Sequence, residues 1–190
     1  DLFAPQLSKR NPEVASTAMY EACFAGNMKV CLWLFDHGAA ETVRTPSNNN
    51  VSPMYVACQE GHLEVAKWLL EVGAAEDVRT RDKFGSSPMH VACLTGHLEV
   101  AKWLLEVGAT EDVRTPNKSG CTPMLLACFK GHLEVAQWLL LNGAANDRAA
   151  EHVDTSFLST LFFHRYKAMA APLQHGLSQL LADHGNFTSL

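Results

Sequence analysis

A single spacing of 35 residues organises most of this chain. Methionine, cysteine, glycine and tryptophan recur at that interval in four copies. The five columns are Met19, Met54, Met89 and Met124; Cys23, Cys58, Cys93 and Cys128; Gly26, Gly61, Gly96 and Gly131; Trp33, Trp68, Trp103 and Trp138; and Gly38, Gly73, Gly108 and Gly143. Five columns in one register do not arise by chance, and a period of this length is typical of repeat architectures.

Each copy has the pattern of two short helices joined by a tight turn. In the third copy, Pro88 suits the first turn of a helix and Ser87 can cap it. Gly96 ends this helix and permits the reversal of the chain. The second helix carries an apolar stripe at i, i+3, i+4 and i+7, formed by Val100, Trp103, Leu104 and Val107. Because one pair cannot bury its apolar faces alone, neighbouring copies must stack on one another.

The best-formed copy, S-P-M-H-V-A-C-L-T-G-H-L-E-V-A-K-W-L-L-E-V-G-A from Ser87 to Ala109, resembles the ankyrin-repeat family. The resemblance covers roughly Thr17 to Asn146 and implies an all-α solenoid of stacked helix-turn-helix units with long loops. The period exceeds the family's usual value of about 33 residues, and the E-D-V-R-T wording is similar to ankyrin arrays of algae and other protists. The family's hydrogen bond between the Thr hydroxyl and the His of T-P-L-H can form at most in the third copy, at His90.

The repeats divide the chain into three parts. We expect an N-terminal extension over residues 1–14, four repeats within 15–146 (about 15–48, 49–83, 84–118 and 119–146), and a helical cap or degenerate fifth repeat over 147–190. The 35-residue period fails after Asn146, and an amphipathic stretch follows, from Phe157 to Arg165. Two interpretations of this stretch stay open: it caps the array, or it docks on a partner or a membrane surface.

The charge balance and hydropathy exclude two classes of function. Fifteen basic residues stand against twenty acidic ones, so the chain lacks the basic field that holds nucleic acid. No apolar run is long enough to cross a bilayer, so we expect no transmembrane segment. We expect an intracellular protein, cytoplasmic or, if its N-terminus is processed, organellar; the sequence does not name the compartment.

Cysteine, histidine and tryptophan are eye-catching but fit a structural role. Packed helices lie about 8–10 Å apart, so equivalent cysteines of neighbouring repeats are too far apart for a disulfide or a shared zinc ion. We expect the cysteine column to be small and buried, with Cys31, an alanine in the other copies, in a similar place; Cys121, in a loop, is the one thiol expected to be reactive. His62, His97 and His132 are expected to bond neighbouring backbone, and the tryptophans to lie in or near the core.

Catalytic patterns do not occur in the sequence. We find no G-x-S-x-G, phosphate-binding loop, dinucleotide-binding glycine pattern, H-E-x-x-H or C-x-x-C. We therefore predict that the chain is not an enzyme and has no catalytic, cofactor-binding or metal-binding residues.

Recognition is expected at positions that vary between copies within the fixed frame. These lie on the first helix of each copy and at the loop tips, which line a concave groove in the family that the chain resembles. The predicted partner-binding residues are Phe24, Val56, Gln59, Glu60, Arg81, Lys83, Phe84, Val91, Leu94, Lys118, Leu126, Phe129 and Lys130. We expect Phe84, Leu94 and Phe129 to be the apolar anchors of this groove. The alternative is that Phe24 and Phe129 only cover the helix-helix turn.

The sequence favours a non-catalytic protein-interaction module, an adaptor or scaffold whose partner is another protein. A second hypothesis is a structural subunit built into a larger assembly, such as a membrane-associated photosynthetic complex. That subunit would dock partly through the apolar C-terminal tail, with Phe157–Arg165 in peripheral contact with the complex. The partner's identity is not encoded in a generic scaffold.

Overall fold

The computed structural model of the chain describes residues 8–10 and 16–144. The predicted C-terminal part over 147–190, with the Phe157–Arg165 segment, lies outside the described residues, as does most of the predicted N-terminal extension.

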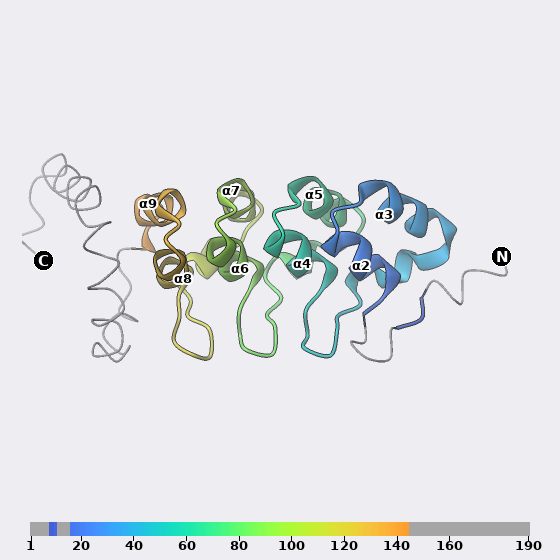
Figure 1. The fold of residues 1–190 in the computed structure, drawn as a ribbon, viewed down its shortest axis with the longest axis horizontal. Helices are drawn as coiled ribbons and strands as arrows, with labels where there is room; N and C mark the ends of the chain where they lie inside the picture. The colour runs from blue at the N-terminus through green and yellow to red at the C-terminus, as the bar shows by residue number, and fades with distance from the viewer. Residues whose placement is uncertain (1–7, 11–15, 145–190) are drawn as a thin grey trace, which may run out of the picture. The chain divides into compact units, whose positions relative to one another are not determined.

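Four helix pairs make up the described array. They are α2 (Ala18–Phe24) with α3 (Met28–Leu34), α4 (Pro53–Gln59) with α5 (Leu63–Glu71), α6 (Pro88–Thr95) with α7 (Leu98–Glu106), and α8 (Pro123–Lys130) with α9 (Leu133–Leu141). In Figure 1 the first helices form one row, the second helices form another, and long loops project on the side of the first row. Over residues 16–144 the secondary structure is helical without strands, which confirms the predicted all-α solenoid.

Side-chain caps start each first helix where the sequence predicts one. Thr17, Ser52 and Thr122 each accept a hydrogen bond from the backbone N–H three residues later, at 3.1, 3.2 and 3.3 Å. In α6 the cap involves the His90 side chain: Nδ1 accepts a hydrogen bond from the Ser87 N–H at 3.3 Å, and the Ser87 hydroxyl lies 3.0 Å from the same nitrogen. The prediction that the hydroxyl–histidine pair occurs in the third copy is thus confirmed.

The core follows the 35-residue columns along the array. Met19, Met54 and Met89 are fully buried, as are Leu69, Leu104 and Leu139, and the first helices pack directly on one another. Full burial of such a side chain stabilises the fold by roughly 1.5–3 kcal/mol. The predicted burial of Cys23, Cys31, Cys58 and Cys93 is confirmed, whereas Cys128 is half-buried.

The tryptophan column is less uniform than predicted. Trp103 is buried and Trp68 and Trp138 are half-buried, but Trp33 is 49% exposed, so the prediction of a core position is wrong for Trp33. Trp33 belongs to the first described helix pair, and its ring stacks on the ring of His37 with centroids 4.3 Å apart. No described helix precedes α2 to cover this side of α3.

Short turns follow the second helices and join neighbouring repeats by ion pairs. The segment after α3 turns through η1 (Phe35–Ala39) and η2 (Ala40–Arg44), and the later repeats carry η3 (Ala75–Val78) and η4 (Glu111–Val113). Arg44 pairs with Glu76 and Asp77 of the next turn at 2.8 and 3.2 Å. Arg79 repeats this arrangement with Glu111 and Asp112 at 2.5 and 3.7 Å. The arginine of one turn therefore pairs with the acidic residues of the next, so this recurring motif makes contacts between consecutive repeats.

Candidate partner-binding surface

The ends of the first helices present a row of unlike side chains. Phe24, just before the turn of the first repeat, is 45% exposed, and its counterpart Phe129 in the fourth repeat is 47% exposed. Gln59 and Leu94 occupy the same position in the two middle repeats and are half-buried. Lys130 is exposed and places its ammonium 5.7 Å from the centre of the Phe129 ring. Equivalent positions of a stacked repeat share one face, so this row is apolar except at Gln59 of the second repeat.

Glu60 adds an acidic group next to the polar part of this row. It is half-buried and accepts a hydrogen bond from Gln59 Nε2 at 2.8 Å. The Gln59 and Glu60 side chains are therefore held together, and they separate Phe24 from Leu94 along the row.

The loop tips are tied to one another by hydrogen bonds. The Lys83 N–H donates to the Asn49 carbonyl at 2.9 Å, and the Lys118 N–H donates to the Phe84 carbonyl at the same distance. Lys83 Nζ also donates to Asn49 Oδ1 at 2.6 Å, and Lys118 Nζ donates to the Lys83 carbonyl at 2.8 Å. Because each tip is bonded to the next, the loops hold Phe84 in a defined place. Its ring is 57% exposed and lies under Lys83 Nζ at 4.9 Å.

Two of the predicted residues are buried. Val56 and Val91 are only 1% and 5% exposed, because α4 and α6 pack against first helices on both sides, so the prediction of a binding role is wrong for them. Arg81 is held by an ion pair: its guanidinium donates to Asp112 at 2.6 Å and to the Gly85 carbonyl at 2.8 Å. Its side chain is 31% exposed, and its binding role stays a prediction. Leu126, in the column of the two valines, is half-buried.

Arg81 has a structural role that the sequence did not reveal. Asp112 is 1% exposed, and a buried carboxylate without a partner would be costly. Arg81 supplies that partner from the preceding loop, and its charge partly offsets the burial that raises the pKa of Asp112. The equivalent positions in the neighbouring loops are Pro46 and Pro116, so only this junction among the described repeats has the second arginine.

The predicted bond from a histidine to neighbouring backbone is confirmed for His62 and His132, and each bond links a repeat to the one before it. His62 Nε2 lies 3.1 Å from the Phe24 carbonyl, and His132 Nε2 lies 3.1 Å from the Leu94 carbonyl. These histidines thus fix the turns that follow Phe24 and Leu94, and they act on the candidate surface by positioning its backbone.

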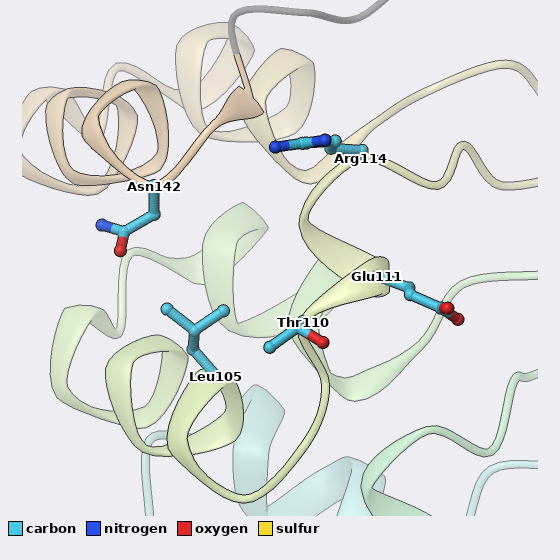
Figure 2. Close-up of a pocket in the computed structure, with 5 residues that line it drawn as sticks. All are labelled: Leu105, Thr110, Glu111, Arg114 and Asn142. Atoms are coloured by element: carbon cyan, nitrogen blue, oxygen red, sulfur yellow. The ribbon is translucent and has the colours of Figure 1, made fainter.

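A pocket lies on another part of the array, between α7 and the end of α9. Leu105, Thr110, Glu111, Arg114 and Asn142 line it (Figure 2). Glu111 points away from the space in Figure 2, and its carboxylate pairs with Arg79. The guanidinium of Arg114 lies against Gly143. None of the predicted binding residues lines this pocket, and its side chains form no constellation suited to catalysis.

Other site types are not found among the described residues. Within 8–10 and 16–144, no group of three His, Cys, Asp or Glu side chains is placed to hold a metal ion. The helices of the same residues include none that is long and apolar enough to span a membrane. The alternative docking segment, Phe157–Arg165, lies outside the described part of the chain.

Three exposed apolar residues of α3 were not predicted. Val30, Leu32 and Trp33 are 40%, 43% and 49% exposed. Only Leu32 differs from the other copies, which have Lys67, Lys102 and Gln137 at that position, so the sequence distinguishes only Leu32.

Comparison with known proteins agrees with the architecture. A family model described as ankyrin repeats (3 copies) matches residues 3–82 and again residues 72–150. No curated protein matches the chain.

Proposed function

Because the chain belongs to the ankyrin-repeat family, whose repeats generally mediate protein–protein interaction, we propose that it binds a partner protein as an adaptor or scaffold. The binding surface is the row of first-helix ends together with the loop tips. Ankyrin-repeat proteins are typically non-catalytic, and we infer the same for this chain.

The observation that supports this proposal best is the exposure of three phenylalanines at non-repeating positions. Phe24, Phe84 and Phe129 are each 45% exposed or more, although the array buries its repeating apolar columns well. Exposed aromatic side chains cost solvation free energy in the free protein and are enriched where partners bind. These positions vary between copies, so the stacking of the repeats does not require an aromatic side chain at any of them.

The chemistry of the surface restricts the partner. Lys83, Lys118 and Lys130 are exposed next to Phe84 and Phe129, whereas Glu21 and Glu60 lie toward the first repeats. A partner that presents apolar side chains flanked by carboxylates would match the end formed by the third and fourth repeats. Binding through that end would weaken as salt concentration rises.

Substitution of the aromatic anchors tests the proposal. Partners recovered from the native cell with the wild-type chain are purified, and their Kd values are measured for Phe84→Ser and for Leu94→Ser combined with Phe129→Ser. Loss of a buried aromatic anchor typically costs 2 kcal/mol or more, so we expect Kd to rise by roughly 30-fold or more. Leu141→Ser is the matched control, since Leu141 is 67% exposed but ends α9 in the other row.

Circular dichroism must show that each variant is folded. Unchanged affinity of folded Phe84 and Leu94/Phe129 variants contradicts the proposal. If affinity is lost only when residues 150–190 are deleted, the partner binds the C-terminal part, and the chain fits the hypothesis of a subunit docked through its tail.

A further inference from the structure

Two cysteine thiols are in contact inside the first repeat. Cys23 Sγ in α2 lies 3.8 Å from Cys31 Sγ in α3, and both side chains are fully buried. We propose that this pair is a redox-modification site, in which a low-molecular-weight disulfide oxidises the two thiols to an intramolecular disulfide. This inference goes beyond the proposed function, because the reaction takes place within one chain and needs no partner protein.

The pair is a local departure from the repeat. Cys58, Cys93 and Cys128 occupy the position of Cys23 in the other copies, but the position of Cys31 holds Ala66, Ala101 and Ala136 there. Small size is all that packing requires at this site, and alanine meets it in three of four copies. The second thiol is therefore an addition to a position that the scaffold fills without sulfur.

The sulfur atoms already lie near bonding distance. A disulfide needs its two sulfurs about 2.05 Å apart, so the present contact must close by less than 2 Å. Bond formation requires that rotation of the two side chains and a small shift of α3 against α2 supply that movement. Both cysteines belong to one helix pair, so the bond does not need to span the distance between repeats.

The two thiols can exchange with a small disulfide in two steps. They share one contact in which either sulfur can donate, and the thiolate is the nucleophile, so the first thiol to ionise when the repeat opens attacks the oxidant. It displaces one thiolate from the small disulfide and forms a mixed disulfide; the second cysteine thiolate then attacks the cysteine sulfur of the mixed disulfide and displaces the other small thiolate. The pair loses two electrons and two protons, and the oxidant becomes two thiols.

The second helix of the first repeat is more exposed than those of the two inner repeats. Val30 of α3 is 40% exposed, whereas its counterparts Val65 and Val100 are each 2% exposed. A repeat with one side uncovered opens locally at a lower free-energy cost than a repeat packed on both sides. Such opening gives a small oxidant access to the buried pair.

An equilibrium measurement tests the proposal. The chain is equilibrated in buffers of defined reduced-to-oxidised glutathione ratio, starting both from the reduced native protein and from the oxidised, refolded protein. Thiols are then alkylated and the protein is digested with trypsin. Cleavage after Lys29 places Cys23 and Cys31 in different peptides, so the disulfide appears as a linked peptide pair in the mass spectrum.

The expected result is a disulfide that the fold favours. The equilibrium constant for forming the Cys23–Cys31 bond should be about tenfold or more higher in the native chain than in the urea-unfolded chain. An equal or lower constant in the native chain overturns the proposal, because the fold would then oppose the bond. Cys31→Ala restores the residue of the other repeats and should abolish the linked pair without loss of the fold.

Ala66→Cys provides a matched gain-of-function variant. It places a second thiol opposite Cys58 and recreates the pair in the second repeat. If helix-pair geometry brings the thiols together, this variant should form a second disulfide. We expect the second bond to form more slowly than the first, since Val65 of α5 is 2% exposed whereas Val30 of α3 is 40% exposed. Faster oxidation of the second pair contradicts the argument that the first repeat opens more readily.

Discussion

At the residue scale, the tightest constraint lies where the turn of one repeat meets a histidine of the next. A Cβ added to Gly96 would lie 2.5 Å from His132 Nδ1, and one added to Gly61 would lie 2.5 Å from His97 Nδ1. The glycine and histidine columns, which look independent in the sequence, are therefore two sides of one contact. The imidazole rests where any other residue would carry its side chain.

Gly96→Ala should destabilise the fold more than Gly131→Ala. Both glycines have positive φ, at 85° and 81°, so the backbone strain of roughly 1–2 kcal/mol is shared. Only Gly96 faces a histidine, because no heavy atom lies within 4 Å of a Cβ built on Gly131. We expect an additional loss of about 1–3 kcal/mol in the free energy of unfolding, measured by urea denaturation.

Adding His132→Ala to the Gly96→Ala variant should recover part of that loss, since the clash is removed. Equal losses for the two alanine variants would show that the imidazole moves aside at no cost.

At the element scale, the start of α6 depends on a neutral histidine. His90 is fully buried in the capping box with Ser87, and burial, with the nearby Arg81 charge, lowers its pKa to about 4. The Nδ1 atom accepts from the Ser87 N–H, which requires that this nitrogen carry no proton. The cap therefore links the stability of the element to pH.

Acidification should weaken the wild-type chain relative to His90→Leu. As pH falls, His90 takes up a proton near pH 6.5 in the unfolded chain but only near pH 4 in the folded chain. The free energy of unfolding therefore decreases between about pH 6.5 and pH 4. At about pH 4 the wild-type chain should have lost roughly 3 kcal/mol of free energy of unfolding relative to the variant. Leucine is the residue of the fourth copy at this position, Leu125. Denaturation of both proteins between pH 7 and pH 4 measures the difference; parallel curves would contradict the assignment.

At the scale of the whole described array, each repeat is stabilised by its contacts with the neighbouring repeats. Each first helix packs on the next, and Arg44 and Arg79 add an ion pair across two of the junctions. These exposed pairs contribute modestly, so apolar stacking dominates. An inner repeat supports two neighbours, whereas α2–α3 has a described neighbour on one side only.

Equivalent leucine substitutions should reveal this difference. Leu34→Ala and Leu104→Ala remove buried side chains that are 3% and 0% exposed, at a cost of about 2–5 kcal/mol each. Hydrogen exchange followed by mass spectrometry should show lost protection in α2 and α3 alone for Leu34→Ala. For Leu104→Ala the loss should extend over all four helix pairs. A uniform loss in both variants would indicate that the array unfolds as one cooperative unit.

Local pattern determined the helices, the turns, the caps and the family. A proline after a hydroxyl residue and a glycine at a helix end each act over a few residues, and the 35-residue period repeats these local signals, so the sequence is sufficient to predict the helices and turns. The hydroxyl–histidine pair at Ser87 and His90 was predictable for the same reason. The sequence also predicted that His62 and His132 bond backbone, but their partners lie 38 residues earlier and only the stacking of repeats identifies them.

Tertiary structure alone decided which variable residues reach solvent and which side chains meet. Val56 and Val91 vary between copies, yet stacking of the first helices buries them, while Arg81 turns back to the buried Asp112. Trp33 is the same residue type as its counterparts in the other copies, but it is 49% exposed because no described helix covers that side of α3. Cys23 and Cys31 meet because the turn folds α3 back onto α2. Each outcome depends on contacts between segments 8 to 35 residues apart, and the energy of those contacts is set by packing in space, which periodicity along the chain does not specify.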